Sequence, residues 1–165
     1  MVALERTATS LKDCVATVGQ LQVVNGSTNV VPGHVSLSLD LRAPTNDQRD
    51  RLVHSAMALL ESICSKRGVS YSVEQTLLAS AAPSDVGLAN AWQRAIESTG
   101  LPVYVLPSGA GHDAMKLHEV MPQAMLFVRG ENLGISHNPL ESSTSHDLQL
   151  GCEAFIHLLD QLSAH

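Results

Sequence analysis

A glycine-rich segment ending in a histidine and an aspartate, 108–114 (Ser-Gly-Ala-Gly-His-Asp-Ala), follows an apolar run that predicts a buried strand. A turn of this kind between a strand and a helix leaves backbone N–H groups free to meet an anion. His112 and Asp113 would stand at the carboxyl end of the strand, where open α/β sheets usually bind ligands. The alternative is a tight turn that His112 merely caps, and the spacing alone favours neither interpretation.

A second histidine lies in the segment 134–141 (Gly-Ile-Ser-His-Asn-Pro-Leu-Glu), again after an apolar run. A loop of glycine, asparagine and proline leaves the imidazole of His137 free to bind a metal ion, and Glu141 could orient that ligand. One histidine does not make a metal site, because three or four ligands are needed. The alternative is an exposed loop histidine without a role.

The third candidate combines the loop 28–33 (Thr-Asn-Val-Val-Pro-Gly) with Arg42. The guanidinium group of an arginine suits the binding of a carboxylate through two parallel hydrogen bonds. Asn29 offers both a hydrogen-bond donor and an acceptor in the preceding loop. The alternative, which the residue types alone favour, is a surface arginine paired with Asp40 or Glu74.

The other histidines share no motif spacing, and none of the three cysteines stands beside a histidine in a nucleophile motif. The sequence also contains no Gly-x-Ser-x-Gly segment. Hydrolase chemistry that uses a side-chain nucleophile is therefore unsupported, and no catalytic residue is assigned within this chain.

The elements that must position the third candidate are two β-rich runs and a helix. Residues 14–24 end at the turn signal Asn25-Gly26, and residues 33–43 alternate between apolar and polar side chains. These runs predict an antiparallel pair with one buried face. A helix begins at Thr45 or Asn46 and runs to about Arg67, closed by Gly68. Its apolar stripe is Leu52, Ala56, Leu59 and Ile63, and a further strand is predicted over Val69–Leu78.

A change of composition at 79–84 (Ala-Ser-Ala-Ala-Pro-Ser) marks a boundary between two lobes. Residues 1–79 predict a small α+β lobe, and residues 80–165 predict an α/β lobe. The second lobe has expected helices at 85–98 and 147–162 and expected buried strands at 103–106 and 125–128. The apolar face of the last helix is predicted to consist of Leu148, Cys152, Phe155, Leu159 and Leu162.

The composition of the chain restricts which binding partners and which cellular compartment are expected. The 165 residues are 44% hydrophobic and 16% charged, with a formal net charge of -6 and no cluster of lysine and arginine. Nucleic acid and anionic membrane surfaces are therefore not expected as partners. No apolar run approaches the roughly 18 to 20 residues that cross a bilayer. Three scattered cysteines and the lack of a signal-peptide pattern predict a reducing, cytoplasmic location.

Four segments together resemble a known family. In chain order, Asn-Val-Val-Pro-Gly (29–33), Asp-Leu-Arg (40–42), 108–114 and 134–141 resemble the allantoate amidohydrolase and N-carbamoyl-L-amino acid hydrolase family. This family belongs to the dinuclear-metal aminoacylase and exopeptidase superfamily. The resemblance runs from about Val15 to the C-terminus and rests on the combination of segments, not on any one of them.

The resemblance implies a two-lobed fold in which residues 1–79 match the later part of a dimerisation lid. Residues 80–165 would match the C-terminal part of a zinc-exopeptidase-like α/β catalytic domain. It further implies that Asn29 and Arg42 grip a substrate carboxylate in the partner subunit's site. By the same resemblance, Gly111 and His112 are substrate-binding residues beside the metal ions, and His137 is a metal ligand. The expected partners are a small carboxylate substrate (allantoate or an N-carbamoyl amino acid) and a second copy that pairs through the lid.

The implied reaction is metal-assisted hydrolysis of a linear amide or ureido C–N bond, with two divalent ions, Zn or Mn, as cofactors. The family's other metal ligands and its base glutamate have no counterpart in this sequence. We therefore expect a fragment that is inactive by itself. An N-carbamoyl-L-amino acid hydrolase is the alternative within the class, and a non-catalytic dimerisation remnant is the alternative outside it.

Overall fold

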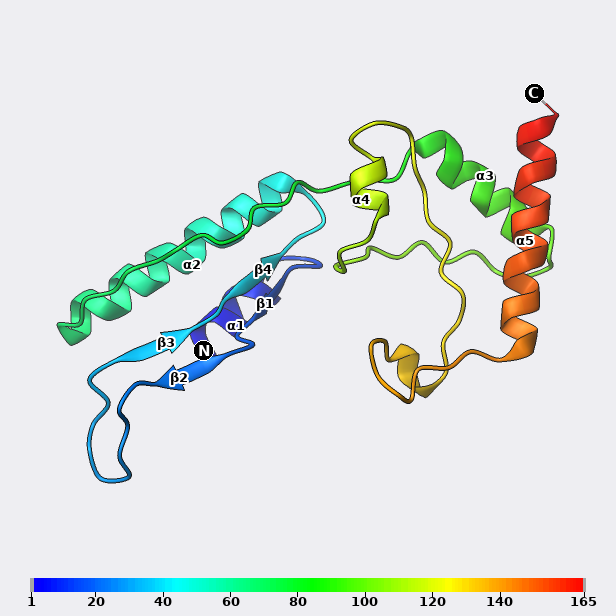
Figure 1. Cartoon of the computed structure of the whole chain (residues 1–165). Helices are drawn as coiled ribbons and strands as arrows, with labels where there is room; N and C mark the ends of the chain where they lie inside the picture. Colours follow the sequence, from blue (N-terminus) through cyan, green and yellow to red (C-terminus); the bar gives the residue numbers. More distant parts are fainter. Residues whose placement is uncertain (1, 165) are drawn as a thin grey trace. The chain divides into compact units, whose positions relative to one another are not determined.

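The computed structural model describes residues 2–164, and the chain divides into two units, each with its own small core (Figure 1). One unit extends to Ala81 and also contains the later segment Pro107–Ala110. The other contains Ala82–Leu106 and the chain from Gly111 onward. The mixture of helices with small antiparallel sheets agrees with the α+β class.

A long antiparallel hairpin provides the strands of the first unit. Its strands are β1 (Val15–Thr17), β2 (Leu21–Val23), β3 (Val35–Leu37) and β4 (Asp40–Arg42). β1 pairs with β4 and β2 pairs with β3, so the predicted antiparallel pairing is confirmed. Between the two ladders the Ser38 N–H donates to the Gln20 carbonyl at 3.1 Å, and the Ser38 hydroxyl accepts a hydrogen bond from the Gln20 N–H at 3.0 Å.

The prediction that one face of this hairpin is buried is wrong for the β2–β3 part. Helices α1 and α2 contact only β1 and β4. In the β2–β3 ladder Leu21 lies opposite Leu37 and Val23 opposite Val35, which places these four side chains on one face. Each of them remains more than 40% exposed, because no layer of residues 2–164 covers that face.

Helix α2 (Asn46–Arg67) begins and ends where the sequence predicts. The Thr45 hydroxyl accepts a hydrogen bond from the Gln48 N–H at 3.2 Å, and Gly68 adopts the left-handed conformation (φ 63°) that closes the helix. Leu52 and Ala56 of the predicted stripe are buried. They face a helix that was not predicted, α1 (Val2–Thr9), which contributes the buried Ala8.

The predicted strand over Val69–Leu78 is wrong, although the segment is extended. Side-chain contacts with α2 hold this part of the chain: the Tyr71 hydroxyl donates to Glu61 at 2.6 Å, and Arg49 donates to the Ala79 carbonyl at 2.6 Å. A strand requires a neighbouring strand for its backbone hydrogen bonds. Among the residues that the structure describes, none pairs with this segment in a ladder.

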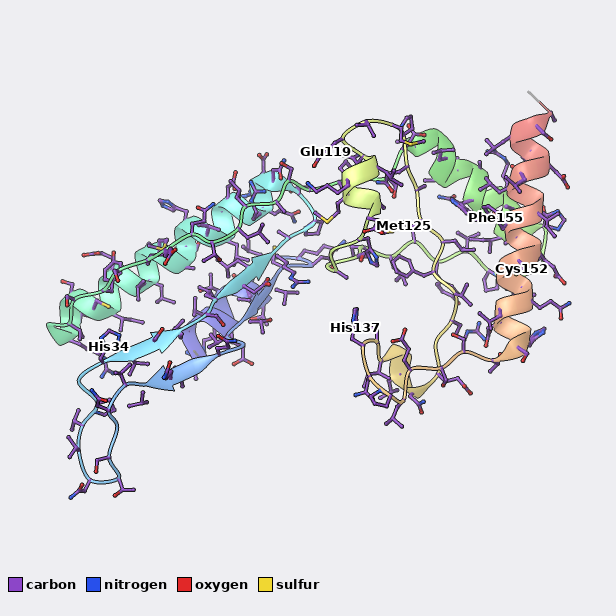
Figure 2. All side chains as sticks on the ribbon, in the orientation of Figure 1. His34, Glu119, Met125, His137, Cys152 and Phe155 are labelled. Atoms are coloured by element: carbon purple, nitrogen blue, oxygen red, sulfur yellow. The ribbon has the colours of Figure 1, made fainter. Side chains whose placement is uncertain are left out.

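In the second unit, α3 (Val86–Glu97) packs against α5 (Ser145–Ser163), which confirms both predicted helices. Ala91 and Ala95 of α3 form a buried cluster with Leu158 of α5, and Ala154 of α5 is also buried. Beside them Trp92 stacks on Phe155, with ring centroids 5.9 Å apart; Phe155 is labelled on α5 in Figure 2.

The apolar face predicted for α5 is not the face that is buried among residues 2–164. Leu148, Phe155, Leu159 and Leu162 are each about half exposed, and Cys152 is exposed as well. The buried stripe runs through Ala154 and Leu158, one residue earlier, which is a rotation of about 100° around the helix axis. Alanine allows the two helix axes to approach closely, and this contact decides which face is buried.

The remaining predicted strands, Val103–Leu106 and Met125–Val128, are also wrong within residues 2–164. Tyr104 and Val105 are 76% and 78% exposed, and neither run forms a ladder. In the part of the second unit that the structure describes, the two further elements are short: α4 (Ala114–Leu117) and η1 (Asn132–Gly134). No helix among the described residues has the length and apolar character needed to cross a membrane.

Candidate functional site

Arg42 is the last residue of β4, and two neighbours hold its guanidinium group. Nε and Nη2 donate to the two carboxylate oxygens of Asp40 at 2.8 and 2.9 Å, and Nη1 donates to the Gly109 carbonyl at 2.8 Å. Residues two apart in a strand point to the same side, so Asp40 is a natural partner. Of the two partners expected for a surface arginine, Asp40 is confirmed. The contact with Gly109 was missed, since a separation of 67 residues leaves no signal in the sequence.

The ion pair changes the protonation of Asp40. Hydrogen bonds from Arg42 lower the pKa of the Asp40 carboxyl, burial opposes this change, and the positive charge of Arg42 adds to it. The hydrogen bonds and the charge of Asp40 in turn raise the pKa of Arg42. Both side chains are 50% exposed, so water screens the pair and its stabilisation of the fold stays below about 1 kcal/mol.

We expect the substitution Arg42→Gln to raise the pKa of Asp40 toward the ordinary aspartate range. With Arg42 present, the folded-state pKa is lowered, so the stabilisation is complete above the ordinary aspartate pKa and is lost as pH falls through the lowered value. The measurement is a pH titration of the Asp40 side-chain carbon by NMR. Arg49→Gln, which removes the partner of Asp50, serves as the control and should leave the Asp40 titration unchanged. An unchanged titration in Arg42→Gln would contradict the assigned cause.

Asn29 lies in the loop that closes the hairpin between β2 and β3. Its side-chain oxygen accepts a hydrogen bond from the Ser27 hydroxyl at 3.2 Å. The Ser27–Val30 bridge and the β2–β3 ladder separate this loop from the β1–β4 ladder that carries Arg42. Asn29 and Arg42 therefore lie at opposite ends of the hairpin, and the structure does not bring these two side chains together.

The segment 108–114 forms an open turn before a single helical turn. The Ser108 hydroxyl accepts a hydrogen bond from the Ala110 N–H at 3.3 Å. A methyl group added at Gly111 would meet no atom within 4 Å, so the surrounding space is free. Asp113 precedes the four-residue helix α4 without forming a side-chain cap. The glycine-rich turn is thus present, whereas the predicted strand before it is not.

His112 is positioned by Phe127 in the second unit. The two rings meet edge to face, with centroids 5.8 Å apart and planes at 70°. The Nε2 atom is covered and has no hydrogen-bond partner among residues 2–164. An unsatisfied buried nitrogen costs about 1–3 kcal/mol, and no hydrogen bond among residues 2–164 offsets this cost.

His137 lies in the exposed loop that follows η1 (Figure 2). Its backbone is in the left-handed region (φ 55°), and its N–H donates to Glu141 Oε2 at 2.8 Å. Glu141 therefore fixes the backbone of His137, whereas the sequence suggested that it would orient the imidazole. A second contact, from the Leu140 N–H to Asn138 Oδ1 at 2.9 Å, tightens the same turn.

The residues that the structure describes do not by themselves fit a dinuclear metal site. Among positions 2–164 no three side chains of histidine, cysteine, aspartate or glutamate gather in a way that could hold an ion. A zinc ion takes four ligands or, in catalytic sites, three protein ligands and a water molecule. His137 has the exposure and the side chain to provide one such ligand.

Comparison with known proteins gives consistent matches over nearly the whole chain. The sequence pattern of peptidase family M20/M25/M40 matches residues 6–161. An N-carbamoyl-L-amino acid amidohydrolase of Geobacillus stearothermophilus is 37% identical over 163 residues, which is 97% of this chain and 39% of that enzyme. An allantoate amidohydrolase of Bacillus subtilis is 31% identical over 148 residues, covering 89% of this chain and 35% of that enzyme.

Solved structures agree with these matches. An amidase of the hydantoinase/carbamoylase family from Burkholderia multivorans superposes with a TM-score of 0.90 at 30% identity, covering 95% of this chain and 38% of that one. A structure of AtUAH in complex with (S)-hydroxyglycine superposes with a TM-score of 0.80 at 26% identity, covering 99% of this chain and 39% of that one. The chain spans between 31% and 39% of the length of the curated relatives it matches.

Proposed function

The chain belongs to peptidase family M20/M25/M40, and from that premise we propose that it forms the substrate-recognition part of a metal-dependent amidohydrolase acting on allantoate. Arg42 would bind the substrate carboxylate in the partner subunit's site, and Gly111 and His112 would be substrate-binding residues beside the metal ions. His137 would be a ligand to one of two divalent ions, Zn²⁺ or Mn²⁺. Asn29 is included only because its motif matches that of the family. In the structure it lies at the far end of the hairpin from Arg42.

The observation that carries this proposal is the state of the Arg42 guanidinium group. Three of its five N–H donors are engaged by Asp40 and Gly109. The other two have no partner among residues 2–164, and the side chain is 50% exposed. A planar, half-exposed guanidinium with free donors suits an incoming carboxylate. The structures of AtUAH with (S)-hydroxyglycine and with glyoxylate support this, since both molecules are small carboxylic acids.

Within this chain, His137 is the residue that we propose as a metal ligand. The loop 134–141 holds the backbone of this residue by the contact with Glu141 and leaves the imidazole exposed. A divalent ion, when bound, polarises a carbonyl group and makes its bound water a stronger nucleophile. The other ligands of the ion would come from residues outside this chain.

An N-carbamoyl-L-amino acid hydrolase is the second candidate. Relatives with the two activities in their names are equally similar to the chain, since the Geobacillus enzyme and a probable allantoate deiminase of rice are both 37% identical to it. Both kinds of substrate carry a carboxylate next to a ureido group. Arg42 would serve either substrate in the same way, so only a comparison of turnover separates them.

We further propose that the first unit is part of a dimerisation lid and that the second is part of a catalytic domain. The exposed apolar face of the β2–β3 ladder supports this, because it is the kind of surface that a second copy covers. The three free cysteines support a reducing, cytoplasmic environment. Light scattering of the purified chain tests the dimer: a mass of twice 17.6 kDa is expected, and a monomer at high concentration would contradict it.

A chimera tests the proposed activity. In it, the present chain replaces the matching 39% of the N-carbamoyl-L-amino acid amidohydrolase of Geobacillus stearothermophilus. We expect the chimera to release ammonia from allantoate, and the ratio of kcat/KM for allantoate and N-carbamoyl amino acids decides between the two candidates. A folded chimera, as judged by circular dichroism, that turns over neither substrate would contradict the proposal and favour a non-catalytic module.

The 165-residue chain by itself is expected to hydrolyse neither allantoate nor an N-carbamoyl amino acid, with or without added Zn²⁺ or Mn²⁺. The reason is that His137 can fill only one coordination position. The measurements are ammonia release and the metal content after dialysis, with the chimera as the positive control. Turnover by the isolated chain would show that it contains a complete site, contrary to the proposal.

A further inference from the structure

We propose that Asp40 is a positioning residue for carboxylate binding: it holds the Arg42 guanidinium in one orientation and leaves two N–H groups for the substrate. This inference rests on the proposed function, because it requires Arg42 to bind a carboxylate. From the sequence alone, Asp40 is only a possible ion-pair partner of a surface arginine. Asp40 itself contacts no substrate in this role.

The geometry of the pair favours a positioning role. Asp40 uses both carboxylate oxygens, at 2.8 and 2.9 Å, and both bonds go to the Nε and Nη2 side of the guanidinium plane. Two parallel hydrogen bonds fix the plane as well as the position of the group. The backbone beneath is also fixed, since Asp40 pairs with Thr17 and Arg42 pairs with Val15 in the β1–β4 ladder.

The third contact links Arg42 to the segment 108–114. Nη1 donates to the Gly109 carbonyl at 2.8 Å, and Gly109 belongs to the same unit as Arg42. The orientation that Asp40 imposes is therefore the one in which Arg42 meets the glycine-rich turn. Loss of the Asp40 carboxylate would remove two of the three hydrogen bonds that hold the guanidinium. The substrate would then have to restrict the motion of a long, half-exposed side chain when it binds.

Because Asp40 is charged, a binding measurement can test whether it acts by orienting Arg42. A carboxylate beside Arg42 neutralises part of the positive charge and, by electrostatics alone, weakens the attraction of an anionic substrate. Removing it would then strengthen binding. If Asp40 instead acts by orienting Arg42, removing it weakens binding, because the substrate must restrict the side chain on association. The two effects have opposite signs.

The test measures binding of N-carbamoylglycine to the complete 165-residue chain by NMR titration. We expect Asp40→Asn, which keeps the shape and removes the charge, to weaken binding by about 3- to 10-fold, as expected when one flexible side chain must be immobilised. Asp50→Asn is the matched control: it removes the partner of Arg49 in the same unit and should leave the affinity unchanged. Binding of the uncharged N-carbamoylglycinamide should not respond to Asp40→Asn.

A second readout separates orientation from general damage to the fold. Relaxation of the side-chain Nε–H signals should show Arg42 becoming more mobile in Asp40→Asn, while Arg49 does not change. Unchanged mobility of Arg42, or unchanged or tighter binding of N-carbamoylglycine, would overturn the positioning role of Asp40. Failure of the proposed function is distinguishable: wild-type chain would then not bind N-carbamoylglycine, or Arg42→Ala would bind it as tightly as wild type.

Discussion

The substitution His137→Ala is expected to lower the turnover of the chimera by more than about 100-fold. Loss of a group that merely orients a metal ligand costs about 10- to 100-fold in metal affinity or activity, so loss of a ligand should cost more. The side chain is exposed and makes no hydrogen bond with residues 2–164, so its removal should leave the fold intact. The measurements are kcat for the preferred substrate and the metal content of the dialysed protein.

His146→Ala is the matched control for this prediction. His146 is also exposed and stands nine positions later, in the first turn of α5. Its substitution should change neither turnover nor metal content. If His137→Ala keeps both the activity and the metal content of the chimera, His137 is an ordinary loop histidine, which is the alternative that the sequence left open.

The substitution Leu52→Ala is expected to lower the free energy of unfolding of the first unit by about 2–5 kcal/mol, because it leaves a cavity in a well-packed site. Leu52 is 1% exposed and is the largest fully buried side chain of the described residues. The core around it contains few other buried side chains, namely Ala8 and Ala56. Such a loss is a large part of the stability of a small unit, which totals about 5–15 kcal/mol in typical domains.

Urea unfolding followed by circular dichroism measures this effect, and Val53→Ala is the control. Val53 is the next residue of α2 but is 38% exposed, so its truncation should cost less than about 1.5 kcal/mol. Equal losses for the two variants would contradict the burial of Leu52 between α1 and α2. That result would also weaken the assignment of α1 as the cover of this face.

Local sequence signals determined α2, α3 and α5, whereas α1 was not predicted. Thr45, Gly68 and Asp85 mark helix ends because a cap depends on hydrogen bonds and backbone conformations within a few residues of itself. The antiparallel pairing of residues 14–24 with 33–43 was predictable for the same reason, since a short connection brings the two strands together. The pairing of Arg42 with Asp40 also follows from their spacing of two in a strand.

Local sequence signals could not determine whether an apolar run forms a strand. The runs at 69–78, 103–106 and 125–128 have the composition of strands, yet a strand exists only where another strand accepts its hydrogen bonds. No neighbour among residues 2–164 does so. For the candidate site, the sequence therefore predicted which residues take part. The strand that it predicted before the glycine-rich turn is absent among residues 2–164.

The sequence by itself therefore determined the helix ends, the hairpin and the family, together with the residues whose types suit carboxylate and metal binding. Only the tertiary structure decided which helix faces are buried, as Ala154 and Leu158 of α5 show, because burial depends on the element that packs opposite. It also decided that the Arg42 guanidinium meets the Gly109 carbonyl and that His137 stands without other ligands among residues 2–164. These outcomes depend on distances between residues far apart in the chain, which local patterns do not contain.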